Sequence, residues 1–224
     1  MVTDVQGDEV ARLRAGEAQA FRSLVERLQQ PVIGYLHRLV GESEVARDLA
    51  QDTFLQVYKE ISKVSGPLAL DPWIYRIATN YGLRYLNRRR LRQFISFSFQ
   101  TENTHTSIAE EYTIGTNTLG HDDFAFLSQM SPSIEEQIET RVLVQQAIDQ
   151  LGHKDAVCVV LHYGSGFTYE EIANIVDSSP EAVRKRVSRG VVKFRAIYEQ
   201  ERQSDPVPRT PREVRKRTRD SMMR

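Results

Sequence analysis

The chain has 224 residues, which is enough for one or two domains with buried cores. Its hydrophobic fraction of 40% and charged fraction of 27% are typical of a globular protein, and no apolar run approaches the roughly 20 residues that a membrane-spanning helix needs. The N-terminus lacks an apolar signal segment and the single cysteine, Cys158, excludes an internal disulfide, so we expect a soluble, cytoplasmic protein with no membrane insertion.

The formal net charge is zero, but the charges are segregated along the chain. Residues 72–95 contain six arginines and no acid, whereas residues 96–140 contain eight acids and no lysine or arginine. A second basic block, residues 182–195, contains six bases and no acid. Such segregation bears on binding partners rather than on the fold.

The N-terminal part, residues 7–95, predicts one helix after another. Apolar residues recur at helical spacing up to a break at residues 41–43, with Pro31 expected to start a helix or to kink one. Ser43 is a plausible N-cap for the next helix. A loop over residues 63–72, which contains one glycine and two prolines, then precedes a further helix.

The rest of the chain divides into three segments. Residues 96–132 are rich in Ser, Thr, Asn and acids without a sustained period, and predict an extended or disordered linker between two domains. Residues 133–200 return to helical patterns, and residues 201–224 predict a flexible basic tail that adds DNA affinity, binds a regulator or only aids solubility. The expected fold class is all-α, with two small helical domains joined by a flexible acidic linker.

The segment TYEEIANIVDSSPEAVRKRVSRG, residues 168–190, has the pattern of a helix-turn-helix. Thr168 and Glu171 have the spacing of a capping box, and Ser179 followed by a proline predicts the start of a second helix. That helix is basic, as suits an element that lies in a DNA major groove. The alternative is a solvated basic helix in an ordinary helical hairpin.

The segment DPWIYRIATNYGLRYLNRRRLR, residues 71–92, combines aromatic rings, amides and guanidiniums. Helical spacing places one stripe of these beside an apolar stripe suited to a core. Aromatic rings stack on unpaired bases and arginines neutralise phosphates, so the mixture suits single-stranded nucleic acid. The alternative, which is compatible with this one, is that the tryptophan belongs to the core. The polar stripe is Trp73, Arg76, Asn80, Arg84 and Asn87.

A third segment, RDLAQDTFLQVYKEI, has polar side chains opposite its apolar stripe, with a leucine among them. Such a stripe is either a simple solvated face or a surface that docks on a partner helix.

These three segments, in their order along the chain, resemble a bacterial RNA polymerase sigma factor of the extracytoplasmic-function (ECF) group, in the sigma-70 family. The resemblance covers residues 8–95 and 133–198 and implies region 2 over residues 1–95, the linker, and region 4 over residues 133–200. DLAQDTFLQVY resembles the helix that docks on the polymerase. PWIYRIATNYGLRYLNRRR resembles the helix that melts and reads the −10 element, and the helix-turn-helix resembles the reader of the −35 element.

The resemblance implies three partners: core RNA polymerase through its β and β′ subunits, promoter DNA as −35 duplex and melted −10 strand, and an anti-sigma factor as a candidate regulator. It implies that the acidic linker runs toward the RNA exit path. Core-binding residues would be Asp48, Gln51, Asp52, Leu55 and Gln56. The −10 DNA would be bound by Trp73, Arg76, Asn80, Arg84, Asn87, Arg88, Arg89 and Arg90. The −35 DNA would be bound by Ser179, Glu181, Arg184, Lys185, Arg186 and Arg189.

Two positions depart from the family pattern. The loop before Trp73 has Lys63 as its only base, which leaves the base preferred at the −10 element open. Asp177 stands where the turn of the helix-turn-helix often has glycine, and aspartate tolerates the left-handed conformation.

Two other classes of protein compete with this reading. One is a repressor or activator that binds duplex DNA without polymerase. The other is a helical enzyme or metal-binding bundle, which would need paired inward carboxylates or Glu-x-x-His spacing. The predicted helical segments have neither pattern, and the sequence shows no nucleophile–base pair and no glycine-rich phosphate loop, so we expect no catalytic residue, no cofactor and no metal.

Overall fold

A computed structural model describes residues 2–100 and 134–204, with side chains described for residues 7–92 and 140–202. The described residues form helices and no strand, which confirms the all-α prediction. The N-terminal bundle contains α1 (Val2–Arg14), α2 (Ala18–Val40), α3 (Ser43–Glu60), the 3₁₀ turn η1 (Ile61–Lys63) and α4 (Leu70–Gln100). The C-terminal bundle contains α5 (Ile134–Asp149), α6 (His153–Val159), the π-helical turn η2 (Val160–Gly164), α7 (Tyr169–Val176) and α8 (Pro180–Ser204).

The boundaries of α2 and α3 follow the sequence with one correction. Pro31 lies inside α2, which continues to Val40 and ends at Gly41 in the left-handed conformation (φ 81°). The prediction that Ser43 is an N-cap is wrong: Ser43 is the first helical residue of α3, and Glu42 precedes it without a side-chain capping bond. Helix α3 packs along α2, and this packing stabilises its start without a side-chain cap.

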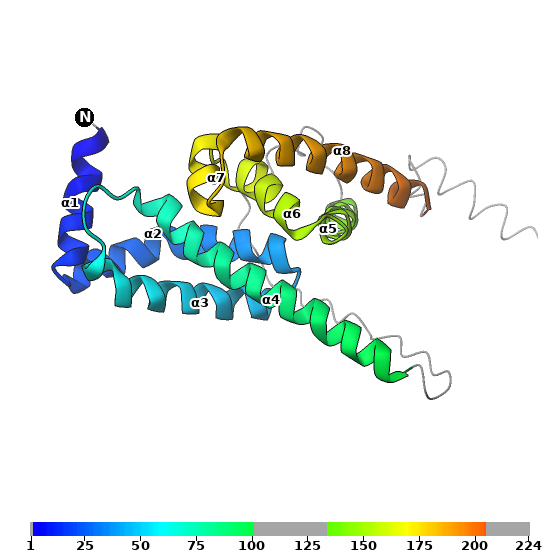
Figure 1. Cartoon of the computed structure of the whole chain (residues 1–224), viewed down its shortest axis with the longest axis horizontal. Helices are drawn as coiled ribbons and strands as arrows, with labels where there is room; N and C mark the ends of the chain where they lie inside the picture. Colours follow the sequence, from blue (N-terminus) through cyan, green and yellow to red (C-terminus); the bar gives the residue numbers. More distant parts are fainter. Residues whose placement is uncertain (1, 101–133, 205–224) are drawn as a thin grey trace, which may run out of the picture.

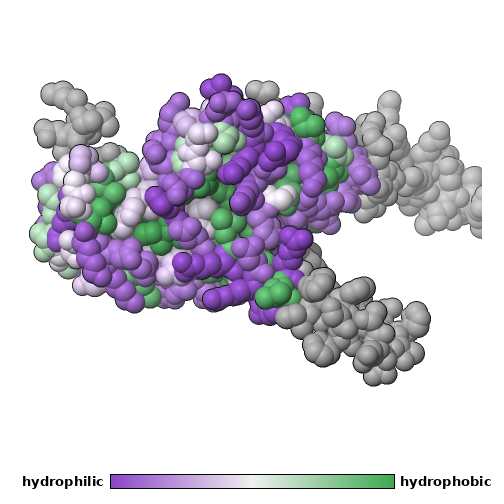
Figure 2. Space-filling model, in the orientation of Figure 1, coloured by the Kyte–Doolittle hydropathy of each residue, from purple (hydrophilic) through white to green (hydrophobic). Residues whose placement is uncertain are grey.

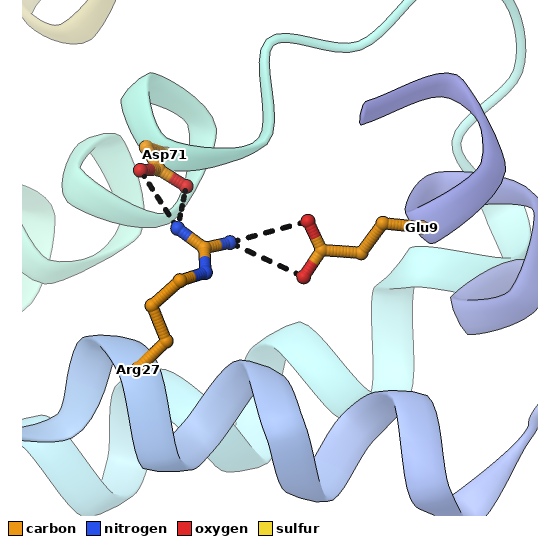
Figure 3. Close-up of polar contacts among 3 residues, drawn as sticks. All are labelled: Glu9, Arg27 and Asp71. Carbon is orange, nitrogen blue, oxygen red and sulfur yellow. Dashed lines mark hydrogen bonds and ion pairs between the residues drawn. The ribbon is translucent and has the colours of Figure 1, made fainter. Parts of the chain in front are cut away.

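Arg27 joins three elements of the N-terminal bundle (Figure 3). Its Nη1 donates to both carboxylate oxygens of Asp71 at 2.9 and 3.0 Å, and its Nη2 donates to both oxygens of Glu9 at 3.2 and 3.3 Å. Asp71 lies in the first turn of α4, where a carboxylate also favours the helix dipole. Arg27 therefore fixes the start of α4 against α2 and α1.

A buried hydroxyl pair joins α2 to the middle of α4. Thr79 Oγ1 donates to the Tyr75 carbonyl at 2.6 Å, so the Tyr35 hydroxyl donates to Thr79 Oγ1, at 2.7 Å. Both side chains are buried, and the bonds satisfy polar groups that would otherwise be costly in the core. Burial raises the pKa of Tyr35, which keeps its hydroxyl protonated as a donor.

The helix-turn-helix forms as the sequence predicts. Thr168 accepts a bond from the backbone N–H of Glu171, whose carboxylate accepts one from the backbone N–H of Thr168. Asp177 adopts the left-handed conformation (φ 51°, ψ 63°) at the turn. Ser179 then caps α8 by accepting from the backbone N–H of Ala182 at 3.2 Å.

The two bundles pack against each other (Figure 1), a contact that the sequence did not predict. Helices α6 and α7 lie against α4, while α5 and η2 lie against α2. The ring of Phe167 meets the ring of Tyr75 edge-on, with centroids 4.7 Å apart, and Gln145 Nε2 donates to the Arg38 carbonyl at 3.2 Å. Helix α4 also continues to Gln100, past the predicted domain boundary at residue 95. The rest of the predicted linker and the predicted tail beyond Ser204 lie outside the described residues.

Gly190 allows α8 to approach α6 closely. A Cβ at this position would lie 2.6 Å from Val159 Cγ2, and a valine side chain has little freedom to move away. We expect Gly190→Ala to lower the free energy of unfolding by about 1–3 kcal/mol, more than the gain in helix propensity of up to about 1 kcal/mol returns. Urea denaturation measures the change.

The control for this substitution is Gly7→Ala, because a Cβ there meets nothing within 4 Å. We expect it to leave the free energy of unfolding unchanged or slightly raised. Equal values for the two variants would contradict the close approach at Gly190.

Candidate functional site

The polar face of α3 is exposed as predicted. Asp48, Gln51 and Asp52 are exposed, and Leu55 has 52% of its surface accessible among them. Gln56, at the edge of this face, is half-buried and donates to Glu60 at 2.7 Å. The opposite side of α3 is buried against the core, so the five predicted residues lie together on one outward surface. A neighbour that sequence reasoning missed, Tyr58, is 61% exposed.

The first part of the α4 stripe also faces outward. Arg76, Asn80 and Arg84 are exposed, while Trp73 is half-buried and packs on the core. The guanidinium of Arg84 lies over the Tyr81 ring, with Cζ 5.8 Å from the centroid. Trp73 therefore packs on the core and also lies beside the exposed residues of the stripe. Both roles are compatible with the sequence.

Two of the predicted −10 residues near the end of this segment, Asn87 and Arg89, have protein partners, although Asn87 is exposed. Asn87 Oδ1 lies 3.3 Å from Nδ1 of His153, at the start of α6, and Arg89 donates to the Val40 carbonyl at 3.2 Å and pairs with Glu42 at 3.2 Å. Burial, with the charge of Arg90 as the second cause, lowers the pKa of His153 and favours its neutral ring. Arg88 and Arg90 are exposed. The C-terminal bundle thus touches this face at Asn87, whereas the partners of Arg89 belong to the N-terminal bundle.

Three predicted residues at the start of α8 are exposed. Lys185 pairs with Glu181 one turn earlier at 2.8 Å, a surface pair that contributes little to stability. Arg184 lies over the ring of Tyr169 on α7, with Cζ 5.7 Å from the centroid. Figure 2 shows a mainly hydrophilic surface over the first part of α8, with apolar patches farther along the helix.

Two other α8 arginines that were expected to bind −35 DNA have neighbours on α6. Arg189 donates to both carboxylate oxygens of Asp155 at 2.8 and 2.6 Å, although it remains 65% exposed. Arg186 is half-buried beside Cys158 on α6. Burial raises the pKa of the Cys158 thiol, and the nearby Arg186 opposes that shift. Both arginines therefore connect α8 to α6. The sequence did not predict these contacts, because the pattern of caps and turns does not reveal a partner about 30 residues away.

Within residues 7–92 and 140–202, no group of three or more His, Cys, Asp or Glu side chains is placed to hold a metal ion. In the same part of the chain, none of the helices combines the length and the apolarity that crossing a membrane requires.

Comparisons with known proteins agree with the two bundles. Residues 24–92 match the family described as Sigma-70 region 2, and residues 141–194 match Sigma-70, region 4. The ECF RNA polymerase sigma-E factor of Haemophilus influenzae is 31% identical over 180 residues, which cover 80% of this chain and 88% of the relative. The RNA polymerase sigma-H factor of Pseudomonas aeruginosa is 28% identical over 190 residues, covering 84% and 92%.

Two solved structures share the fold. CnrH, in complex with the cytosolic domain of CnrY, superposes with a TM-score of 0.59 at 18% identity, over 86% of this chain and 96% of that one. The sigma factor RpoE from Bartonella quintana, in complex with the anti-sigma factor NepR, gives a TM-score of 0.55 at 17% identity, over 81% and 98%. The match to both regions and to relatives along most of their length decides against a stand-alone repressor. This chain belongs to the ECF group of the sigma-70 family, whose members bind core RNA polymerase and direct transcription to promoters.

Proposed function

We propose that three separate surfaces of this chain divide the work of promoter recognition. The α3 surface, defined by Asp48, Gln51, Asp52, Leu55 and Gln56, binds core polymerase. The exposed part of α4 binds the melted −10 strand, and the start of α8 binds the −35 duplex. The observation that carries the proposal is the exposure of all three surfaces on helices whose opposite sides are buried.

Melting of the −10 element follows from the chemistry of α4. Unstacking a base costs a few kcal/mol, which ring stacking and hydrogen bonds to the freed base offset. Trp73 and Tyr81 supply rings, Asn80 supplies an amide for a base edge, and Arg76 and Arg84 supply charge for phosphates. The chain makes or breaks no covalent bond in this process, which is therefore binding work rather than enzyme chemistry, carried out in the cytoplasm.

Simultaneous reading of both elements requires the two bundles to separate. Elements centred near −10 and −35 are roughly 25 base pairs apart, on the order of 85 Å along duplex DNA. In the packed arrangement α7 of the helix-turn-helix touches α4, and a helix of 31 residues is only about 46 Å long. Residues 101–133, between the described parts, can reach at most about 110 Å, so the covalent connection permits the separation.

We infer that an anti-sigma factor holds this chain inactive until a signal releases it. The inference is supported by the overall likeness to RpoE of Bartonella quintana, which was solved in complex with the anti-sigma factor NepR. A co-purifying protein that lowers transcription when added back to the purified chain would support it.

The proposed function is tested by in vitro transcription. Core polymerase from the same source, this protein and sheared genomic DNA are combined, and the 5′ ends of transcripts are mapped. We expect discrete starts that depend on the protein and share two spaced upstream elements. The absence of new starts, together with tight binding to a duplex site without polymerase, would overturn the proposal.

Asn80→Ala tests the proposed base reader on α4. Asn80 is exposed on a helix face, so its loss should leave the fold intact. Removal of a side chain that hydrogen-bonds one base costs about 1–3 kcal/mol of discrimination, so we expect transcription from a cognate promoter to fall roughly 5- to 150-fold. Binding to core polymerase, measured by fluorescence anisotropy, should not change.

The matched control for Asn80→Ala is Asn174→Ala, on the exposed side of α7. If Asn80→Ala transcribed as well as wild type, or lost core binding in parallel, its role as a base reader would be wrong.

A further inference from the structure

The guanidinium of Arg184 rests on an aromatic platform that lies outside the recognition helix. We propose that Tyr169, supported by His162, is a positioning residue that orients Arg184 and thereby sets the base preference at one position of the −35 element. The inference rests on the proposed function, because it takes Arg184 as a reader of −35 DNA. It assigns a role in sequence selection to two side chains that need not touch the DNA.

The position of Tyr169 is fixed by its neighbours, although its ring is partly exposed. It is the first residue of α7, directly after the Thr168–Glu171 capping box, which fixes the backbone at this point. Arg184 Cζ lies 5.7 Å from the centroid of its ring, within the roughly 6 Å over which a cation is attracted to an aromatic face.

His162 packs against the same ring. The two ring centroids are 4.6 Å apart with an interplanar angle of 26°, which is a stacked arrangement. His162 Nδ1 donates to the Phe167 carbonyl at 2.9 Å, since a carbonyl oxygen can only accept. The backbone N–H of Phe167 donates in turn to the Leu161 carbonyl at 3.1 Å. This ring of bonds locks the imidazole, and the imidazole limits how far the Tyr169 ring can turn.

The π-helical turn η2 explains why His162 lies here. An α-helix repeats every 3.6 residues, and the wider π-turn shifts the direction of the side chains within it. Such turns are frequent at functional sites. This shift could not be predicted from the sequence, because residues 160–164 have the pattern of a short apolar helix that simply continues.

Orientation matters for Arg184 because of the shape of its head group. A guanidinium is planar and pairs with the O6 and N7 atoms of guanine through two parallel hydrogen bonds. A free arginine samples many rotamers, so a ring that restricts the plane before binding reduces the entropy lost on binding. Loss of the platform should therefore weaken the preference for one base, about two- to fivefold, the effect of an exposed cation–π contact.

The experiment measures base preference with the intact holoenzyme. Promoters randomised one position at a time across the −35 element are transcribed with wild type, Tyr169→Leu, Tyr169→Phe, His162→Ala and Arg184→Ala, and transcripts are counted by sequencing. We expect Arg184→Ala to flatten the preference at one position, and Tyr169→Leu to weaken it there about two- to fivefold. Tyr169→Phe, which keeps the ring face, should match wild type, and His162→Ala should act in the same direction as Tyr169→Leu.

A double substitution separates positioning from general damage. Residues that act through one another are not additive, so Tyr169→Leu should have no further effect on that preference in an Arg184→Ala background. Tyr198→Leu is the matched control, because Tyr198 is also half-buried and stacked, on Phe194, later in α8. It should leave the −35 preference unchanged, and thermal unfolding of every variant reports on folding.

Several results would overturn the inference. Equal losses for Tyr169→Phe and Tyr169→Leu would assign the effect to a hydroxyl contact. Additive losses, or losses at different positions of the element, would show that Tyr169 does not act through Arg184. An Arg184→Ala variant with unaltered −35 preference, but normal −10 selection, would remove Arg184 from the −35 site and the platform with it. That outcome is distinct from failure of the proposed function, in which no variant shows promoter-dependent starts.

Discussion

Joining the two bundles covalently should abolish promoter-directed transcription. The interface offers a suitable pair, because Asn87 Oδ1 on α4 and His153 Nδ1 on α6 are 3.3 Å apart. Asn87→Cys with His153→Cys can be linked by a short bismaleimide that contains a reducible bond. Because the linked chain cannot place α4 and α8 on elements on the order of 85 Å apart, we expect the yield of discrete starts to fall by more than about tenfold and to return on reduction.

The native thiol does not interfere with this design. Cys158 is fully buried and burial raises its pKa, so both its access and its thiolate fraction are low. Each single-cysteine variant, treated with the same reagent, controls for the loss of Asn87 or His153 themselves. A linked protein that transcribes as well as the reduced one would show that the packed arrangement is compatible with promoter binding.

Reversing the charge of the α3 surface should have the second largest effect. Asp48 and Asp52 are exposed one turn apart beside Leu55, on the surface proposed to bind core polymerase. Asp48→Arg with Asp52→Arg would place positive charge where the partner is expected to complement negative charge. Like charges that meet at an interface cost several kcal/mol, so we expect the Kd for core polymerase to rise at least about tenfold.

The control for charge itself is Asp8→Arg with Glu26→Arg, two exposed acids on α1 and α2. That variant has the same net charge as the α3 variant and should bind core polymerase like wild type. Similar losses for both variants would point to long-range electrostatics, and wild-type affinity for the α3 variant would remove this surface from the interface.

Most features with local causes were predictable from the sequence, with the N-cap of α3 as an exception. The helix-turn-helix depends on caps and turn residues within a few positions of one another, and Thr168, Asp177 and Ser179 behave as their chemistry indicates. The outward stripe of α4 follows from the helical period, and Ile74 and Ala78 are buried on its other side.

Features that depend on distant partners were not predictable. Arg189 matched the pattern of a basic side chain that contacts DNA, but its partner Asp155 lies on another helix. The contact between Tyr75 and Phe167 joins two domains that look independent in sequence. It was not predictable, because an aromatic residue that packs on another domain has the same helical spacing as one that packs in its own core. The stack of His162 on Tyr169 depends on a π-turn, for which no composition signal exists.

The two bundles that touch belong to one chain, and this affects how the protein can be regulated. Two domains on one chain meet at an effective concentration in the millimolar range, set by the connecting segment and not by the amount of protein. The fraction of molecules in the open arrangement is therefore the same at nanomolar and at micromolar levels. Synthesis of more protein raises the number of open molecules only in proportion, whereas a ligand that prefers one arrangement changes the fraction itself.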